Sequence, residues 1–118
     1  MEQLLVVEHS RLFREGLALL LEWRTGLRSV HAKSLAEAMA ILEEADWKPA
    51  CIIVDLDLPD GQATEVLKEV DGLPVLALIR SRNVERQAEA IGLGAEEVLL
   101  TAESGEKIAA AVERLIGR

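Results

Sequence analysis

The sequence is poor in residue types that often carry chemistry, because its 118 residues include one cysteine, Cys51, two histidines and no tyrosine. A single cysteine excludes an intramolecular disulfide and any CxxC metal site. No apolar stretch approaches the roughly 18–20 residues that a membrane-spanning helix needs. The first residues also lack the basic and apolar regions of a signal peptide. We therefore expect a cytoplasmic protein without a membrane segment.

Positive charge is scarce as well, since 21 acidic residues stand against 13 basic ones and give a formal net charge of −8. Such a chain should repel nucleic acid and anionic membranes, so we expect it not to bind DNA or RNA directly. Half of the residues are apolar but only three are aromatic, which predicts a core of Leu, Ile, Val and Ala. The length suits a single domain over residues 1–118.

Apolar runs and amphipathic stretches alternate five times along the chain. The expected strands are 4–7, 28–31, 50–54, 75–79 and 98–100. The expected helices are 11–24, 34–46, 62–70, 83–91 and a last one capped by Ser104. This order predicts an α/β fold in which helices cover both faces of a parallel sheet. The second strand is half polar, which indicates an edge position.

Asp55 is the most informative residue, because it closes the apolar run Cys51-Ile52-Ile53-Val54 and is followed by Asp57 two positions later. In open α/β sheets, functional groups lie at the carboxyl ends of the strands. Two carboxylates at such a strand end therefore mark the candidate functional site.

Several segments together resemble the receiver domain of two-component response regulators. They are Asp55-Leu56-Asp57-Leu58-Pro59, Leu73–Leu78, Gly94–Leu100 and Leu12–Leu17, the last resembling receivers that precede helix-turn-helix DNA-binding domains. The resemblance implies a (βα)5 flavodoxin-like, doubly wound sheet with strand order 2-1-3-4-5. It also implies a role in signal transduction without enzymatic turnover.

Receivers accept a phosphoryl group from a histidine kinase on an aspartate, with a divalent cation to neutralise charge. The resemblance implies Asp55 as the phosphoacceptor, in service or as a vestige. It also implies Glu8, Asp55 and Asp57 as ligands of a weak Mg²⁺ site. The alternative for these three carboxylates is an acidic remnant at a solvated sheet end.

Four positions depart from the receiver pattern. His9 stands where a second acid should be, which weakens a site for a hard cation. Ile79 replaces the switch Thr or Ser, and Val98 replaces the aromatic residue that follows it. Thr101 replaces the lysine that would supply positive charge. These losses predict an atypical receiver, a pseudo-receiver, that acts through protein–protein interaction.

Two other functions are open. The first is a working phosphoacceptor, phosphorylated on Asp55 by a histidine kinase. The second is a flavin- or nucleotide-binding protein of similar topology, although the loop at residues 8–11 is acidic and lacks the glycine that a phosphate loop needs. His9 could ligate a transition metal or hydrogen-bond a carboxylate, and Arg80 could serve as a surrogate cation or be solvated.

The expected partners are a histidine kinase, a phosphotransfer protein or an output protein. A homodimer would use the face made by helix 83–91, strand 98–100 and the last helix. Trp23 and Trp47 lie at the ends of the first and second expected helices, where we expect their rings to pack over apolar surface, with partner contact as the alternative.

Overall fold

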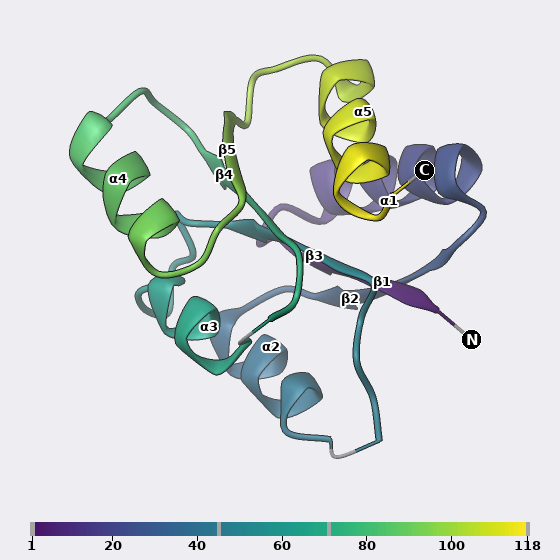
Figure 1. Cartoon of the computed structure of the whole chain (residues 1–118), viewed down its shortest axis with the longest axis horizontal. Helices are drawn as coiled ribbons and strands as arrows, with labels where there is room; N and C mark the ends of the chain where they lie inside the picture. Colours follow the sequence, from purple (N-terminus) through teal and green to yellow (C-terminus); the bar gives the residue numbers. More distant parts are fainter. Residues whose placement is uncertain (1, 45, 71, 118) are drawn as a thin grey trace.

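The computed structural model describes residues 2–44, 46–70 and 72–117. Its strands are β1 Gln3–Val7, β2 Arg28–Ala32, β3 Cys51–Asp55, β4 Val75–Ile79 and β5 Glu97–Leu100. Its helices are α1 Arg11–Thr25, α2 Leu35–Leu42, α3 Thr64–Glu69, α4 Val84–Gly92 and α5 Gly105–Leu115. The strands form one parallel sheet in the order β2-β1-β3-β4-β5, which confirms the predicted architecture (Figure 1).

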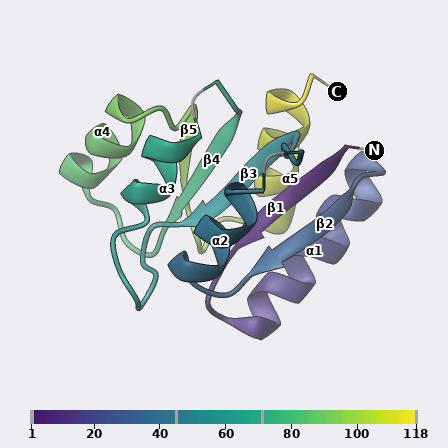
Figure 2. The same ribbon diagram turned by 90° about the horizontal axis from the view of Figure 1, so that it is seen from below.

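Helices cover both faces of this sheet. Figures 1 and 2 show α1 and α5 together on one face and α2 and α3 on the other, with α4 beside α3. Alternate residues of the inner strands enter the two cores, so that Ile53 packs with α1 and α5 while Ile52 packs with the other helices. Because β3 and β4 are buried on both sides, they are continuous apolar runs rather than alternating ones. None of the described helices is long and apolar enough to cross a membrane.

The register of the strands brings their carboxyl ends to one edge of the molecule. Val7 of β1 pairs with Val54 of β3, so the next residues, Glu8 and Asp55, are level with each other. On the far side of β4, Ile79 pairs with Leu100 of β5. The half-polar β2 lies at the sheet edge, as its composition indicates.

Side-chain caps begin several helices where the sequence predicts them. Ser34 Oγ accepts a hydrogen bond from Glu37 N at 3.1 Å, and Glu37 Oε1 accepts one from Lys33 N at 2.9 Å. Ser104 Oγ accepts from Lys107 N at 3.2 Å, which caps α5. These bonds satisfy backbone N–H groups that a helix start otherwise leaves without acceptors.

Three local predictions were wrong. Helix α2 ends at Leu42 instead of Asp46, because two acids follow it and its last turn has no basic residue to oppose the helix dipole. Helix α3 begins at Thr64 instead of residue 62, since Ala63 has no side-chain acceptor to cap it. Trp23 lies on the outer face of α1 and is 79% exposed instead of covering apolar surface, whereas Trp47 packs against the core.

Candidate functional site

Two buried carboxyl groups face each other at the carboxyl ends of β1 and β3. Glu8 is 4% exposed and Asp55 is 1% exposed. Burial, together with the hydrogen bond and the negative charge of Asp55, raises the pKa of Glu8 to about 8. A proton on Glu8 therefore links the two groups at neutral pH, because two carboxylates alone could not hydrogen-bond each other.

One oxygen of each carboxyl group lacks a donor. Within the described parts of the chain, no hydrogen-bond donor reaches Glu8 Oε2 or Asp55 Oδ2 when both groups are ionised. A buried acceptor without a partner is costly, so this pair requires either a shared proton or a cation. The chemistry of the two carboxylates suits a hard cation such as Mg²⁺, which would displace the proton.

Asp57 is turned away from this pair and toward α4. Its Oδ1 accepts from Arg86 Nη1 at 2.6 Å, and its Oδ2 accepts from Arg80 N at 3.0 Å. Burial alone would raise the pKa of Asp57, but the Arg80 N–H and the Arg86 guanidinium outweigh it and hold the pKa below its ordinary value. Arg86 Nη2 also donates to the Leu56 carbonyl at 2.9 Å. We call this set of contacts the Arg86–Asp57 clamp.

The proposed Mg²⁺ ligands are thus only partly brought together. Glu8 and Asp55 are adjacent, and the Asp57 N–H donates to Asp55 Oδ1 at 2.8 Å, but the Asp57 carboxylate is held by arginine. Across residues 2–44, 46–70 and 72–117, no group of three or more His, Cys, Asp and Glu residues is arranged to hold a metal ion. The fit to Mg²⁺ therefore rests on two carboxylates.

His9 is exposed and lies toward a different acid. Asp60 accepts from Leu35 N at 2.9 Å and from Ala36 N at 3.1 Å, and so binds the first turn of α2. These two N–H groups lower the pKa of Asp60, and the charge of His9 lowers it further by a smaller amount. No sequence signal marked the contact between Asp60 and α2.

The positions of the expected switch relay form an apolar strip. Ile79 is fully buried in the core, and Val98 packs against the same cluster. Thr101 N donates to the Ile79 carbonyl at 2.7 Å, which places the lysine position directly beside the switch position. Thr101 Oγ1 is buried, with no hydrogen-bond partner among the described residues. Ile79 therefore supplies no hydroxyl at the switch position, and Thr101 supplies no cation at the lysine position. The hydroxyl of Thr101 is the one polar side-chain group at these two positions.

Positive charge reaches the site from β4 and α4 instead. Arg80 is exposed, yet its charge partly opposes the rise in the pKa of Glu8 that burial causes, and it adds to the lowering of the pKa of Asp57. Arg86 contacts Asp57 directly, and sequence reasoning missed it. The one local feature of Arg86 in the sequence is its place three residues after Asn83, which caps α4. Asn83 Oδ1 accepts a hydrogen bond from Arg86 N at 3.0 Å. Nothing in that spacing identifies an acid 29 positions earlier as its partner.

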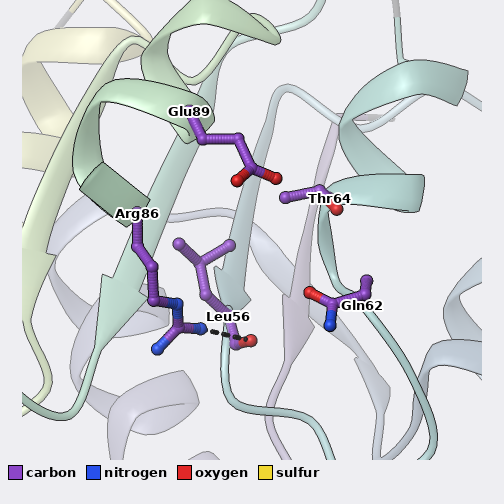
Figure 3. Close-up of a pocket in the computed structure, with 5 residues that line it drawn as sticks. All are labelled: Leu56, Gln62, Thr64, Arg86 and Glu89. Carbon is purple, nitrogen blue, oxygen red and sulfur yellow. Dashed lines mark hydrogen bonds between the residues drawn. The ribbon is translucent and has the colours of Figure 1, made fainter. Parts of the chain in front are cut away.

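A polar pocket of about 270 Å³ lies next to the clamp. Its lining residues are Leu56, Gln62, Thr64, Arg86 and Glu89. Figure 3 shows Arg86 and Glu89 on α4 facing Gln62 and Thr64 near the start of α3, with Arg86 bonded to the Leu56 carbonyl. The clamp therefore closes one side of the gap between α3 and α4.

Comparison with known proteins identifies the family pattern. The model of the family described as "Response regulator receiver domain" matches residues 4–113. The KDP operon transcriptional regulatory protein KdpE of Escherichia coli (strain K12) is 32% identical over 102 residues. That alignment covers 84% of this chain and 44% of the relative, so the chain spans less than half of the relative's length.

Solved structures share the fold closely. A CheY-like receiver domain protein from Methanospirillum hungatei JF-1 has a TM-score of 0.89 at 16% identity, over 99% of this chain and 94% of that one. A Burkholderia pseudomallei response regulator with a phosphorylated aspartic acid, a calcium ion and citrate has a TM-score of 0.84 at 23% identity. It is matched over 99% of this chain and 69% of its own. At these identities the likeness establishes the fold.

Proposed function

Because this chain belongs to the response regulator receiver domain family, whose members act in two-component signalling, we propose that it is an atypical receiver with a degenerate phosphorylation switch. In this proposal it signals through protein–protein contacts and has no catalytic turnover of its own. Its partners would be a histidine kinase, a phosphotransfer protein or an output protein.

The observation that carries the proposal is the apolar relay beside Asp55. A phosphoryl group on an aspartate adds negative charge that must meet a cation and hydrogen-bond donors. Ile79 offers neither and is fully buried, so it cannot turn toward the phosphoryl group without opening a cavity in the core. Thr101 carries no charge, and its backbone is bonded to the Ile79 carbonyl. Phosphorylation would therefore gain little stabilisation and would have no hydroxyl to move at the switch position, Ile79.

The Arg86–Asp57 clamp supports the same conclusion from the other side. It joins α4 to the loop after β3 through two contacts, at 2.6 Å and 2.9 Å, without any phosphoryl group. Charge-assisted bonds of this kind are the stronger hydrogen bonds in proteins. We propose that the clamp keeps α4 in one position and so replaces a phosphorylation-dependent arrangement with a constitutive one.

The Mg²⁺ site is part of the proposal only in a weak form. Glu8 and Asp55 would hold the ion, which would supply charge neutralisation at the strand ends. His9 is exposed and Asp57 is paired with arginine, so two of the surrounding positions contribute no free carboxylate. We expect Mg²⁺ affinity well below that of a site with three acidic ligands, and its loss in Glu8→Gln.

The alternative function is a phosphoacceptor that still works, with Asp55 phosphorylated by a histidine kinase. The Asp55 Oδ2 at the strand end favours it, because among the described residues only a proton on Glu8 could engage this oxygen, and loss of that proton would leave it as the nucleophile. The Burkholderia pseudomallei relative, which has a phosphorylated aspartic acid in the same fold, is consistent with it.

Intact mass after incubation with acetyl phosphate and Mg²⁺ separates the two functions. The degenerate switch predicts no phosphoryl adduct on a protein that circular dichroism shows to be folded. An adduct on the wild type and on Asp57→Asn, but not on Asp55→Asn, would establish the alternative and refute the proposal. Asp57→Asn is the matched control because it removes a carboxylate two residues away.

A further inference from the structure

Helix α1 presents an apolar ridge that nothing in the described chain covers. Leu12, Leu19 and Trp23 are 86%, 69% and 79% exposed, and their spacing places them on one outward face of the helix. Figure 2 shows α1 along the outer flank of the sheet, beside β2. Its opposite face, with Leu17 and Leu21, packs into the core. We call Leu12, Leu19 and Trp23 the α1 ridge.

Grooves lie on both sides of this ridge. Between α1 and α5 is a largely apolar groove of about 250 Å³, whose lining includes Gly16, Leu20 and Gly105. Between α1 and β2 is a second groove of about 270 Å³, whose lining includes Ala18 and His31. A helix ridge flanked by grooves is the surface that another helix with the same features fits, by packing ridges into grooves.

Gly16 makes a gap in the ridge that has no internal explanation. It lies inside α1 between Leu12 and Leu19, where glycine destabilises a helix relative to alanine. Apart from its two chain neighbours and the backbone of its own helix, a Cβ placed there would meet no described heavy atom within 4 Å, and the backbone is ordinary helix. The intramolecular packing therefore does not require glycine, whereas close approach of a second helix would make use of the gap.

The pattern of the ridge fits its own copy in antiparallel orientation. Leu12 and Trp23 are eleven residues apart, or about 16 Å along the helix. Two antiparallel copies place Leu19 of one over the Gly16 gap of the other and bring each Trp23 to the opposite Leu12. A parallel arrangement would set gap against gap and leave it empty. An interface of this kind has two-fold symmetry, the commonest symmetry of dimers.

The charges around the ridge favour a second copy over a basic partner. Arg11 Nε contacts Glu15 Oε1 at 3.0 Å, and Glu22 Oε2 accepts from Ser29 N at 2.8 Å. Arg24 is bonded to Glu106 of α5 at 2.5 Å. These charged groups have partners within the chain, so the patch does not call for a partner of opposite charge.

From these observations we propose that the α1 ridge is a self-association surface on which two copies of this chain pack α1 against α1 in antiparallel orientation. The three ridge side chains expose roughly 450 Å² per copy. With flanking side chains, two copies would bury about 1,200 Å², at the lower end for specific interfaces, which is typical of a weak, reversible dimer. This surface is distinct from the face of α4, β5 and α5 that the family resemblance suggests.

Sedimentation velocity from about 5 to about 500 µM tests the proposal by mass action. The wild type should shift from monomer to dimer, and the double variant Leu19→Ser/Trp23→Ser should need at least about tenfold higher concentration to do so. The matched control is Val84→Ser/Ile91→Ser on α4, which removes two side chains that are 74% and 56% exposed and should leave association unchanged.

A monomer over the whole range would overturn the proposal, as would a dimer that the α4 variant disrupts and the α1 variant does not. Asp55→Asn should associate like the wild type, because the α1 ridge does not involve Asp55. The self-association proposal and the degenerate-switch proposal can therefore fail separately. Four of the five substituted side chains are exposed, and only Asp55 is buried. Circular dichroism checks that each variant folds.

Discussion

The carboxyl pair at the strand ends predicts an unusual dependence of stability on pH. Burial and the neighbouring Asp55 raise the pKa of Glu8 from 4.5 to about 8. Between these two values the folded chain keeps the Glu8 proton while the unfolded chain has lost it. Folding therefore takes up a proton, and the free energy of unfolding falls as pH rises through this window.

The size of the effect follows from linkage. One proton of difference changes the free energy of unfolding by about 1.4 kcal/mol per pH unit. Relaxation of the site and competing groups reduce this ceiling, so we expect Glu8 to contribute a loss of about 2 kcal/mol between pH 5.5 and pH 7.5. Above a pH near the folded pKa, the loss should level off because both states are then ionised.

Glu8→Gln isolates this contribution. The amide is neutral at every pH and can donate to Asp55, so it imitates the protonated acid. Urea unfolding in EDTA at several pH values from 5.5 to 8.5 should give the variant a flatter profile than the wild type. The free energy of unfolding of the variant should exceed that of the wild type by about 2 kcal/mol at pH 7.5, and the two should approach each other at low pH. Glu44→Gln removes an exposed acid and is the control for net charge.

Parallel profiles for the wild type and Glu8→Gln would refute the reasoning, since they would mean that Glu8 titrates alike in the folded and unfolded chains. Asp55→Asn adds a second check. It removes the negative charge of Asp55 and replaces its carboxylate with a neutral amide, but it leaves burial, which is the largest cause of the raised pKa. We therefore expect it to reduce the pH dependence without abolishing it.

Three further changes test other parts of the site and surface. Arg86→Gln should destabilise the fold by about 1 kcal/mol and speed amide hydrogen exchange at the start of α4, whereas the exposed Arg82→Gln should do neither. Ile79→Thr combined with Thr101→Lys should restore a hydroxyl and a cation, so that acetyl phosphate yields an Asp55 adduct in intact mass; the double variant remaining unmodified would contradict the assigned cause of degeneracy. Gly16→Ala should raise the free energy of unfolding by about 0.5–1 kcal/mol and weaken self-association in sedimentation velocity. A more stable protein with unchanged association would count against the α1 interface.

The architecture could be predicted because its determinants are local and repetitive. Apolar runs bounded by turns, with helical stretches between them, specify parallel strands buried on both faces. The half-polar composition of β2 indicates its edge position, and Ser34 and Ser104 mark helix starts by chemistry that needs no tertiary contact. Helix ends were less predictable, because the early end of α2 depends on a balance of weak terms at its last turn.

The site could be predicted only as a location. Asp55 was identified because it closes an apolar run and Glu8 through the resemblance to receivers, and the register then brings them level. The role of Asp57 could not be foreseen, since its side chain chooses between the acidic pair and Arg86 according to where α4 lies in space. Long arginine side chains reach partners far away in sequence, and spacing alone does not reveal them.

The site has Thr101 instead of a lysine after β5, yet its acids are not left without compensating groups. Two arginines and one proton do the neutralising: Arg86 pairs with Asp57, Arg80 acts on Glu8 and Asp57 through its charge, and Glu8 holds a proton. A buried carboxylate without such partners would be expensive. Because Asp57 and Glu8 already have these partners in the resting chain, a phosphoryl group would have to displace existing contacts instead of filling vacant ones. Phosphorylation would then carry an energetic cost, which is the physical basis for expecting a constitutive interaction module.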